Sequence, residues 1–253
     1  MCTIESNEWI AFLKNIKQAK RDLGSPEMLW YRGQPNYDHY LLPSLLRFKN
    51  GIDKEKYLYT NFRKFSDKLL KKRESEWETL FDMQHYGIPT RLLDWTESFG
   101  IALFFAAYYN IYYSGNKKTN AAIYLLDPVK LNLISGQNKT YRLPDEEKGF
   151  KYTGIYWDKK PFKANAPIAI EPIFINDRMV AQRGVFTIHD DSIDPIEKKF
   201  PEVIKKIMLP HDVISAALEF LDLANINHYS VYPDLAGIAG HLKKASGLEP
   251  RWT

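Results

Sequence analysis

The stretch from Gln84 to Ser98 constrains the fold of this chain more than any other. It reads QHYGIPTRLLDWTES and continues into an apolar segment, residues 99–109. A glycine and a proline in its middle predict the end of one helix. Arg91–Trp95 then reads as a short strand, and Thr96 or Ser98 can cap the helix that follows. Polar groups at a strand-to-helix junction are typical of places where proteins bind anions or carry out chemistry.

Length and composition predict an ordinary globular protein that can bury a sizeable core. The chain has 253 residues, of which 45% are hydrophobic and 26% are charged. Cys2 is the only cysteine, which excludes a disulfide framework and a thiolate zinc site. The first thirteen residues lack an apolar signal core, and no apolar run has transmembrane length. We therefore expect a cytoplasmic protein without membrane contact.

The apolar periodicity predicts helices and strands along the whole chain. Helices are expected at 6–20, 53–73, 75–85, 99–109, 212–224 and 233–244, and strands at 28–31, 91–95, 121–126, 168–175, 184–188 and 204–209. Because helices dominate the first half and strands the second, we predict one α+β domain over residues 1–253, with a helical N-terminal half around a mixed or antiparallel sheet. Residues 132–166 are weakly periodic and are predicted to be an insertion or a lid.

Basic residues gather in one region, from Lys49 to Arg73, although the net charge of the whole chain is only +4. Acidic residues are interspersed there, so a solvated helix face is the favoured interpretation, with a nucleic-acid surface as the alternative. The chain has 16 Tyr, 14 Phe and 6 Trp, which we expect mostly in or beside the core rather than in a surface that stacks bases.

Several familiar catalytic motifs are absent from the sequence. It has no GxxxxGK[ST] loop, no GxGxxG, no GxSxG and no HExxH. Kinases, classical dehydrogenases, serine hydrolases and zinc hydrolases are therefore poor candidates. The run His189-Asp190-Asp191 could supply metal ligands, but a polar cluster at the end of a strand is favoured, and we expect no metal.

Five segments together resemble the FRG domain family, which is named for an aromatic-Arg-Gly motif. They are Trp30 to Gln34, Leu42 to Arg47, Gln84 to Ala106, Arg178 to Thr187 and Tyr232 to Ala239, and they include Tyr31-Arg32-Gly33. The resemblance spans roughly residues 28–240 in the expected order. This family occurs in bacteria and phages, and membership implies little about activity.

A second, more distant likeness is to the ADP-ribosyltransferase superfamily, whose members use NAD. The order of a strand with Arg-Gly, then a strand with Thr-x-Ser before a helix, then a third polar position is similar in this chain. The likeness implies that Arg32 contacts NAD phosphates or ribose and that Thr96 and Ser98 form the Ser/Thr motif. Gln182 takes the third position, where the superfamily has glutamate.

Glutamine lacks the negative charge that stabilises the positively charged ribose when the glycosidic bond breaks. Asp94 or Glu97 could supply that charge if the fold brings one of them close to the ribose.

The remaining candidates for ligand contact are Gln84, His85, Arg91 and Asp94. Arg91 and Asp94 are favoured as a structural pair, and Asp94 is expected to be partly buried between two apolar residues. His85 complements the dipole at the end of its helix or acts as an acid and base. Each glutamine is expected to bind backbone or to contact a ligand amide or a base edge.

We expect eight polar residues to converge on one cleft. They are Arg32, Gln84, His85, Arg91, Asp94, Thr96, Ser98 and Gln182. Arg32 either clamps a ligand there or satisfies loop carbonyls and pairs with Asp94.

Two functions follow from these expectations. The first is an NAD-using enzyme similar to ADP-ribosyltransferases, a transferase or an NAD glycohydrolase, such as a toxin or a phage-defence effector. The second is a noncatalytic module that binds a nucleotide or a nucleic acid. The sequence identifies neither an acceptor molecule nor an oligomeric state.

Overall fold

The computed structural model describes residues 2–70, 75–114, 118–136, 141–142, 150–160, 166–174 and 176–247. The helices are α1 (Asn7–Asp22), α2 (Gly51–Ser66), α3 (Glu76–His85), α4 (Phe99–Ser114), α5 (Pro128–Ile134), α6 (Asp177–Gln182), α7 (Ile196–Lys199), α8 (Ile214–Leu223), α9 (His228–Val231) and α10 (Leu235–Ala245). The strands are β1 (Trp30–Gln34), β2 (Leu92–Thr96), β3 (Ala121–Leu126), β4 (Tyr141–Arg142), β5 (Ile168–Glu171), β6 (Gly184–Ile188) and β7 (Ile204–Leu209). Short helical turns are η1 (Leu45–Arg47), η3 (Gly154–Asp158) and η4 (His211–Val213).

The strands form one sheet in the order β4-β5-β6-β2-β1-β3-β7. Neighbouring strands are antiparallel except β4 and β5, which are parallel. The predicted α+β class with a mixed sheet is therefore confirmed. Its central strands β1, β2 and β3 come from the first half of the chain, so helices and strands alternate more than the sequence indicated. That one domain spans residues 1–253 stays a prediction.

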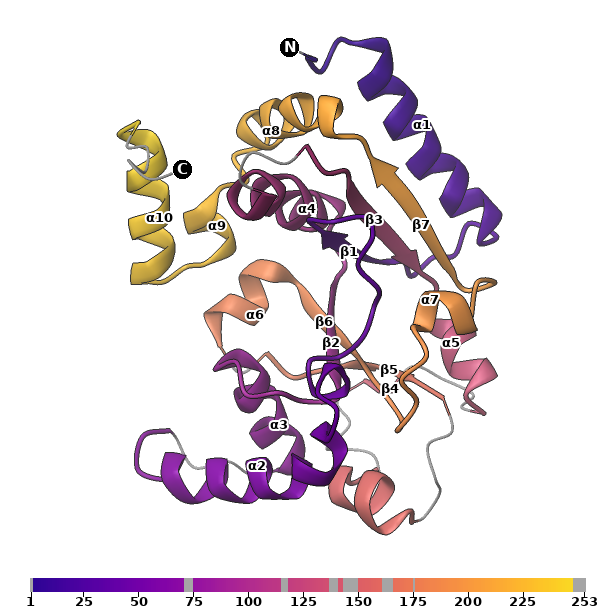
Figure 1. Cartoon of the computed structure of the whole chain (residues 1–253), viewed down its shortest axis with the longest axis vertical. Helices are drawn as coiled ribbons and strands as arrows, with labels where there is room; N and C mark the ends of the chain where they lie inside the picture. The colour runs from indigo at the N-terminus through magenta and orange to yellow at the C-terminus, as the bar shows by residue number, and fades with distance from the viewer. Residues whose placement is uncertain are drawn as a thin grey trace.

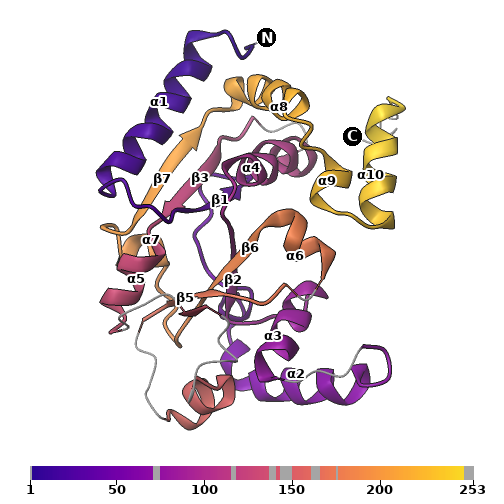
Figure 2. The same ribbon diagram turned by 180° about the vertical axis from the view of Figure 1, so that it is seen from behind.

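The sheet is weakly joined between β1 and β2. Tyr31 and Thr96 form the single register pair between these strands, whereas every residue of β1 pairs with β3 and every residue of β2 pairs with β6. Figure 1 shows the consequence: β1, β3 and β7 lie with α1, α4 and α8 in the upper part, and β2, β5 and β6 lie with α2, α3 and α6 below. The view from behind shows the same division (Figure 2). The molecule thus has two groups of strands that separate beyond one pair.

Helix α4 packs closely against β1, and Gly33 permits this contact. A Cβ atom at Gly33 would lie 1.8 Å from the carbonyl oxygen of Ala102 and 2.7 Å from the backbone nitrogen of Ala106. Any other residue would collide with the helix backbone. The glycine of the Tyr-Arg-Gly motif therefore sets the distance between α4 and the sheet.

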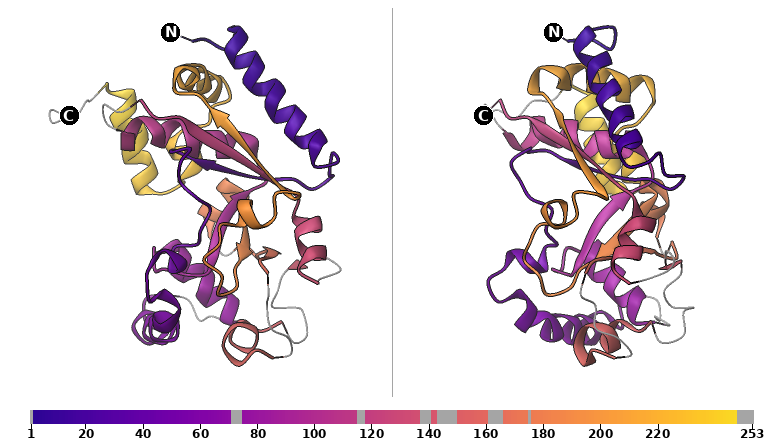
Figure 3. Two further views of the ribbon diagram at one scale, coloured as in Figure 1. Left: turned by 45° about the vertical axis from the view of Figure 1, so that its right-hand side comes forward. Right: turned by 90° about the vertical axis from the view of Figure 1, so that its right-hand side faces the viewer.

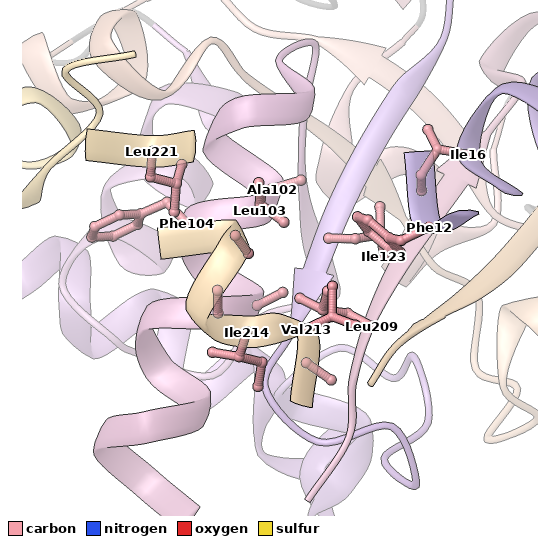
Figure 4. Packing of buried hydrophobic residues seen from close by; sticks show 14 of the residues in the cluster. Phe12, Ile16, Ala102, Leu103, Phe104, Ile123, Leu209, Val213, Ile214 and Leu221 are labelled. Atoms are coloured by element: carbon pink, nitrogen blue, oxygen red, sulfur yellow. The ribbon is translucent and has the colours of Figure 1, made fainter. Parts of the chain in front are cut away.

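The apolar core lies on both sides of the sheet. One cluster joins α1, α4 and α8 to β3 and β7, and Figure 4 shows Phe12, Leu103, Ile123 and Leu209 meeting there. A second cluster lies under α2 and α3, and a third covers the face that carries Trp95. Figure 3 shows α1 and α2 at opposite ends of the molecule. No helix in the described ranges is long and apolar enough to cross a membrane.

Most predicted elements occur, with shifted ends. The strands at 121–126, 184–188 and 204–209 have the predicted bounds. Helix α1 begins after Ser6, whose hydroxyl accepts a hydrogen bond from the Trp9 backbone nitrogen at 3.2 Å. Helix α2 ends at Ser66, well before the predicted end near 73. The Ser66 hydroxyl donates to the Phe62 carbonyl at 2.6 Å, a local bond that competes with helix continuation.

The predicted insertion or lid at 132–166 is described only in part. Residues 150–160 are described, and Tyr152, Ile155 and Tyr156 are buried in the cluster under α2 and α3. This part of the segment therefore belongs to the core. Residues 137–140, 143–149 and 161–165 lie outside the described residues.

Candidate functional site

A cleft of about 260 Å³ opens where β1 and β2 separate, and helices α3, α4 and α6 complete its walls. Its polar lining is Arg32, Gln84, His85, Asp94, Thr96, Arg178 and Gln182. Four aromatic side chains also line it, Tyr31, Phe81, Phe105 and Phe186. Six of the eight residues expected to converge therefore line one cleft. Arg91 and Ser98 do not.

Arg32 extends into the gap between the two strands. Its Nη1 donates to the backbone carbonyl of Asp94 at 2.5 Å and lies 3.7 Å from Oδ2 of the same residue. Burial lowers the pKa of Arg32, and the Asp94 charge opposes that shift. The Nε atom is buried and has no partner among the described residues. Arg32 thus satisfies a carbonyl and pairs with Asp94, and it keeps one buried donor at the wall of the cleft.

Asp94 faces the cleft and is exposed, not partly buried as expected. Its side chain is 54% exposed. Side chains alternate along a strand, so Leu93 and Trp95 occupy the opposite, buried face of β2. Gln84 Nε2 donates to Asp94 Oδ2 at 2.9 Å, and Thr90 Oγ1 donates to Gln84 Oε1 at 2.6 Å. This chain of hydrogen bonds holds the carboxylate in one orientation.

The side chains of Thr96 and Ser98 form hydrogen bonds with backbone atoms of the protein. Thr96 Oγ1 donates to the Gln182 carbonyl at 2.7 Å and accepts from the Ser98 backbone nitrogen at 3.0 Å. Ser98 Oγ accepts a long hydrogen bond of 3.4 Å from the backbone nitrogen of Ile101 at the start of α4. Gln182 Nε2 donates to the Val231 carbonyl at 3.2 Å, so this amide binds backbone. These contacts tie β2 to α4, α6 and α9 at one end of the cleft.

His85 and Arg178 form another part of the wall. Burial, followed by the nearby Arg178 charge, lowers the pKa of His85, while Asp82 and Asp234 oppose the shift. The imidazole is therefore neutral at pH 7. The Arg178 guanidinium lies 4.3 Å from the centroid of the Tyr232 ring.

Arg178 was not among the residues predicted for the site. It belongs to α6, which the sequence analysis also missed. The available signal was Asn176, whose side chain caps this helix by accepting from the Met179 backbone nitrogen at 2.9 Å.

Arg91 is a buried structural residue. Only 1% of its side chain is exposed, and its Nε and Nη2 donate to the two oxygens of Glu55 at 2.5 and 2.8 Å. Its Nη1 donates to Asp191 at 2.6 Å. Tyr152 and Trp157 also donate to Glu55. Arg91 therefore pairs with Glu55 and Asp191 rather than with Asp94, and it links α2 to the start of β2 and the end of β6.

The residues His189, Asp190 and Asp191 each contact other groups of the protein. His189 Nε2 lies 3.0 Å from Thr187 Oγ1, and burial, with nearby cations including Arg32, lowers the pKa of His189 to about 3. Both aspartates pair with basic residues. Within the described ranges, no group of three or more His, Cys, Asp or Glu could hold a metal ion.

The fold and the cleft together define an α+β protein whose candidate site lies at a split in its central sheet. Residues 27–112 match the FRG domain, so the chain carries an FRG domain. The matched segment contains β1, α3, β2 and most of α4, and with them Arg32, Gln84, His85, Asp94 and Thr96. Searches of curated proteins and of solved structures find no match. The likeness to ADP-ribosyltransferases stays a prediction.

Proposed function

We propose that the cleft binds a nucleotide and that the chain is an NAD-using enzyme similar to ADP-ribosyltransferases. The observation that carries this proposal is the exposed carboxylate of Asp94, which shares an aromatic-lined cleft with Arg32 and Arg178. Arginine recognises phosphate, aromatic rings stack on a base, and a carboxylate stabilises positive charge on a ribose. In this proposal the protein acts as a toxin or a phage-defence effector.

In the proposed reaction, Asp94 supplies the negative charge that Gln182 lacks. In the proposed reaction the bond between the ribose C1′ and the nicotinamide nitrogen breaks, and nicotinamide leaves with the electron pair, which neutralises its pyridinium charge. The ribose becomes positively charged, and Asp94 stabilises this charge. Water or an acceptor nucleophile then adds to C1′ and releases a proton. Glu97, the other carboxylate considered, lines a separate hollow rather than the cleft.

The size of the cleft favours a mononucleotide or one half of a dinucleotide. Its volume of about 260 Å³ is slightly below the usual range of ligand pockets, which is about 300–1,000 Å³. Arg32, one of the residues that line the cleft, has a buried Nε donor without a partner among the described residues. The remainder of NAD would extend beyond the cleft.

The direct test is incubation with NAD labelled in nicotinamide, followed by measurement of released nicotinamide. Asp94→Asn keeps the shape of the side chain and removes its charge, so release should fall at least about 100-fold, the usual effect of a lost electrostatic group. Glu97→Gln is the matched control, because it removes the same charge from an exposed residue outside the cleft. Release that is absent from the wild type, or equal in both variants, contradicts the proposal.

A noncatalytic nucleic-acid module is the second candidate, and the exposed face of α2 supports it. Lys56 and Lys64 are exposed along this helix, as are the rings of Tyr57 and Phe65, and Lys68 is exposed just after its end. Cations interleaved with exposed rings suit a single strand, whose phosphates and bases both find contacts. Equally, these cations suit a solvated helix face. Binding of a single-stranded oligonucleotide at α2 without turnover of NAD would favour the second candidate.

A further inference from the structure

We infer that Arg178 is the residue that binds the phosphate or pyrophosphate group of the ligand. This inference rests on the proposed function, since it assumes that the cleft takes a nucleotide. It narrows the sequence-based expectation, in which Arg32 contacts the phosphates or the ribose.

The two arginines of the cleft differ in charge balance. Arg32 lies 3.7 Å from the Asp94 carboxylate and donates to the Asp94 carbonyl, so its charge is already partly compensated. Arg178 forms no ion pair and donates no hydrogen bond within the described part of the chain. It therefore brings to the cleft a positive charge without an ion-pair partner and a set of unused hydrogen-bond donors, as far as the described residues show. An anionic ligand gains more from that charge than from one with a carboxylate partner.

The geometry of Arg178 is suited to a flat, two-point contact. Its guanidinium lies 4.3 Å from the centroid of the Tyr232 ring. Contact with the face of a ring leaves the N–H groups at the edge of the guanidinium available, and that edge matches two phosphate oxygens. The Tyr232 hydroxyl lies 2.7 Å from the Tyr109 hydroxyl, which fixes the ring. The arginine is thus held in place before the ligand arrives, which reduces the entropy lost on binding.

His85, beside Arg178 in the cleft wall, adds no charge to this part of the cleft, although the carboxylates of Asp82 and Asp234 also act on it. His85 is neutral at pH 7, because burial and the Arg178 charge lower its pKa. Its imidazole can then donate or accept one hydrogen bond without adding charge. Asp94, the acidic residue of the cleft lining, is engaged by Gln84 and Arg32. Arg178 and Arg32 therefore contact different groups of one ligand. The phosphate lies at Arg178, and the sugar lies near Arg32 and Asp94.

Calorimetric titration of the full chain with ADP, adenosine and inorganic pyrophosphate tests this assignment. Arg178→Gln should weaken ADP and pyrophosphate at least about tenfold, the lower range for a lost hydrogen bond to a charged group. Adenosine, which lacks the phosphates, should bind the variant as it binds the wild type. Arg178→Lys should recover part of the loss. Arg21→Gln on α1 is the matched control, because it removes one exposed positive charge away from the cleft.

The possible results separate the two proposals. Equal binding of ADP by wild type and Arg178→Gln overturns the part given to Arg178 and leaves nucleotide binding intact. A larger loss in Arg32→Lys than in Arg178→Gln returns the phosphate to Arg32. If the wild type binds pyrophosphate through Arg178 but binds neither ADP nor adenosine, the anion site is supported and the proposal that the cleft binds a nucleotide is contradicted. A wild type that binds none of the three overturns both.

Discussion

Arg91 and Asp94 lie close together in sequence and have opposite surroundings. Arg91 is 1% exposed and meets the buried Glu55, whereas Asp94 is exposed in the cleft. We predict that Arg91→Met lowers the free energy of unfolding by about 3–5 kcal/mol, because it leaves the Glu55 charge buried without its cation. Asp94→Asn should cost less than about 1 kcal/mol, as exposed pairs contribute little. Urea denaturation measures both, and equal losses would contradict this division between scaffold and site.

His189 should make stability depend on pH. Its pKa is lowered to about 3 by burial and nearby cations, whereas the ordinary value is 6.5. The folded protein therefore keeps this residue neutral while the unfolded chain takes up a proton below pH 6.5. Its contribution is complete above 6.5 and is lost as the pH falls toward 3, by about 1.4 kcal/mol per pH unit.

The measurement is urea denaturation of wild type and His189→Gln between pH 7 and 5. Glutamine retains a side-chain group that can bond Thr187 but does not titrate in this range. The difference in unfolding free energy between the two proteins should change with the predicted slope. A difference that stays constant over this range would show that His189 is not held neutral.

At the scale of elements, the contact between α4 and β1 depends on Gly33. We predict that Gly33→Ala lowers the free energy of unfolding by about 1–3 kcal/mol or more, because its Cβ would meet the helix backbone at Ala102. Gly184→Ala in β6 is the matched control, since its Cβ would make only ordinary contacts with Met179 at 3.7 Å. Thermal unfolding compares them. Similar melting temperatures would mean that α4 can move away without cost.

The bounds of a helix or strand were predictable from the sequence where a single local pattern determines them. The apolar runs of β3, β6 and β7 gave their bounds, and the Ser6 cap gave the start of α1. The separation of β1 from β2 was not predictable, because strand pairing depends on contacts between distant segments. The short helix α6 was missed because six residues show too little periodicity.

In the molecule as a whole, most of the polar residues predicted to converge line one cleft, but their individual contacts were not predictable from the sequence. Arg32, Gln84, His85, Asp94, Thr96 and Gln182 meet there from four elements. Polarity at a strand end does not reveal whether a side chain faces a cleft or binds backbone. Thr96 and Gln182 bind backbone, and Asp94 faces the cleft. The Glu55 partner of Arg91 lies on another helix, and local sequence could not identify it.

The most direct test of the central claim, that this cleft binds a nucleotide, is mapping of amide chemical shifts in the full chain during titration with NAD. We predict saturable shifts at Arg32, Asp94 and Arg178, with little change on α2. The same titration with a single-stranded oligonucleotide should leave the cleft signals unchanged. An absence of saturable shifts with NAD, or shifts confined to α2, would contradict the account.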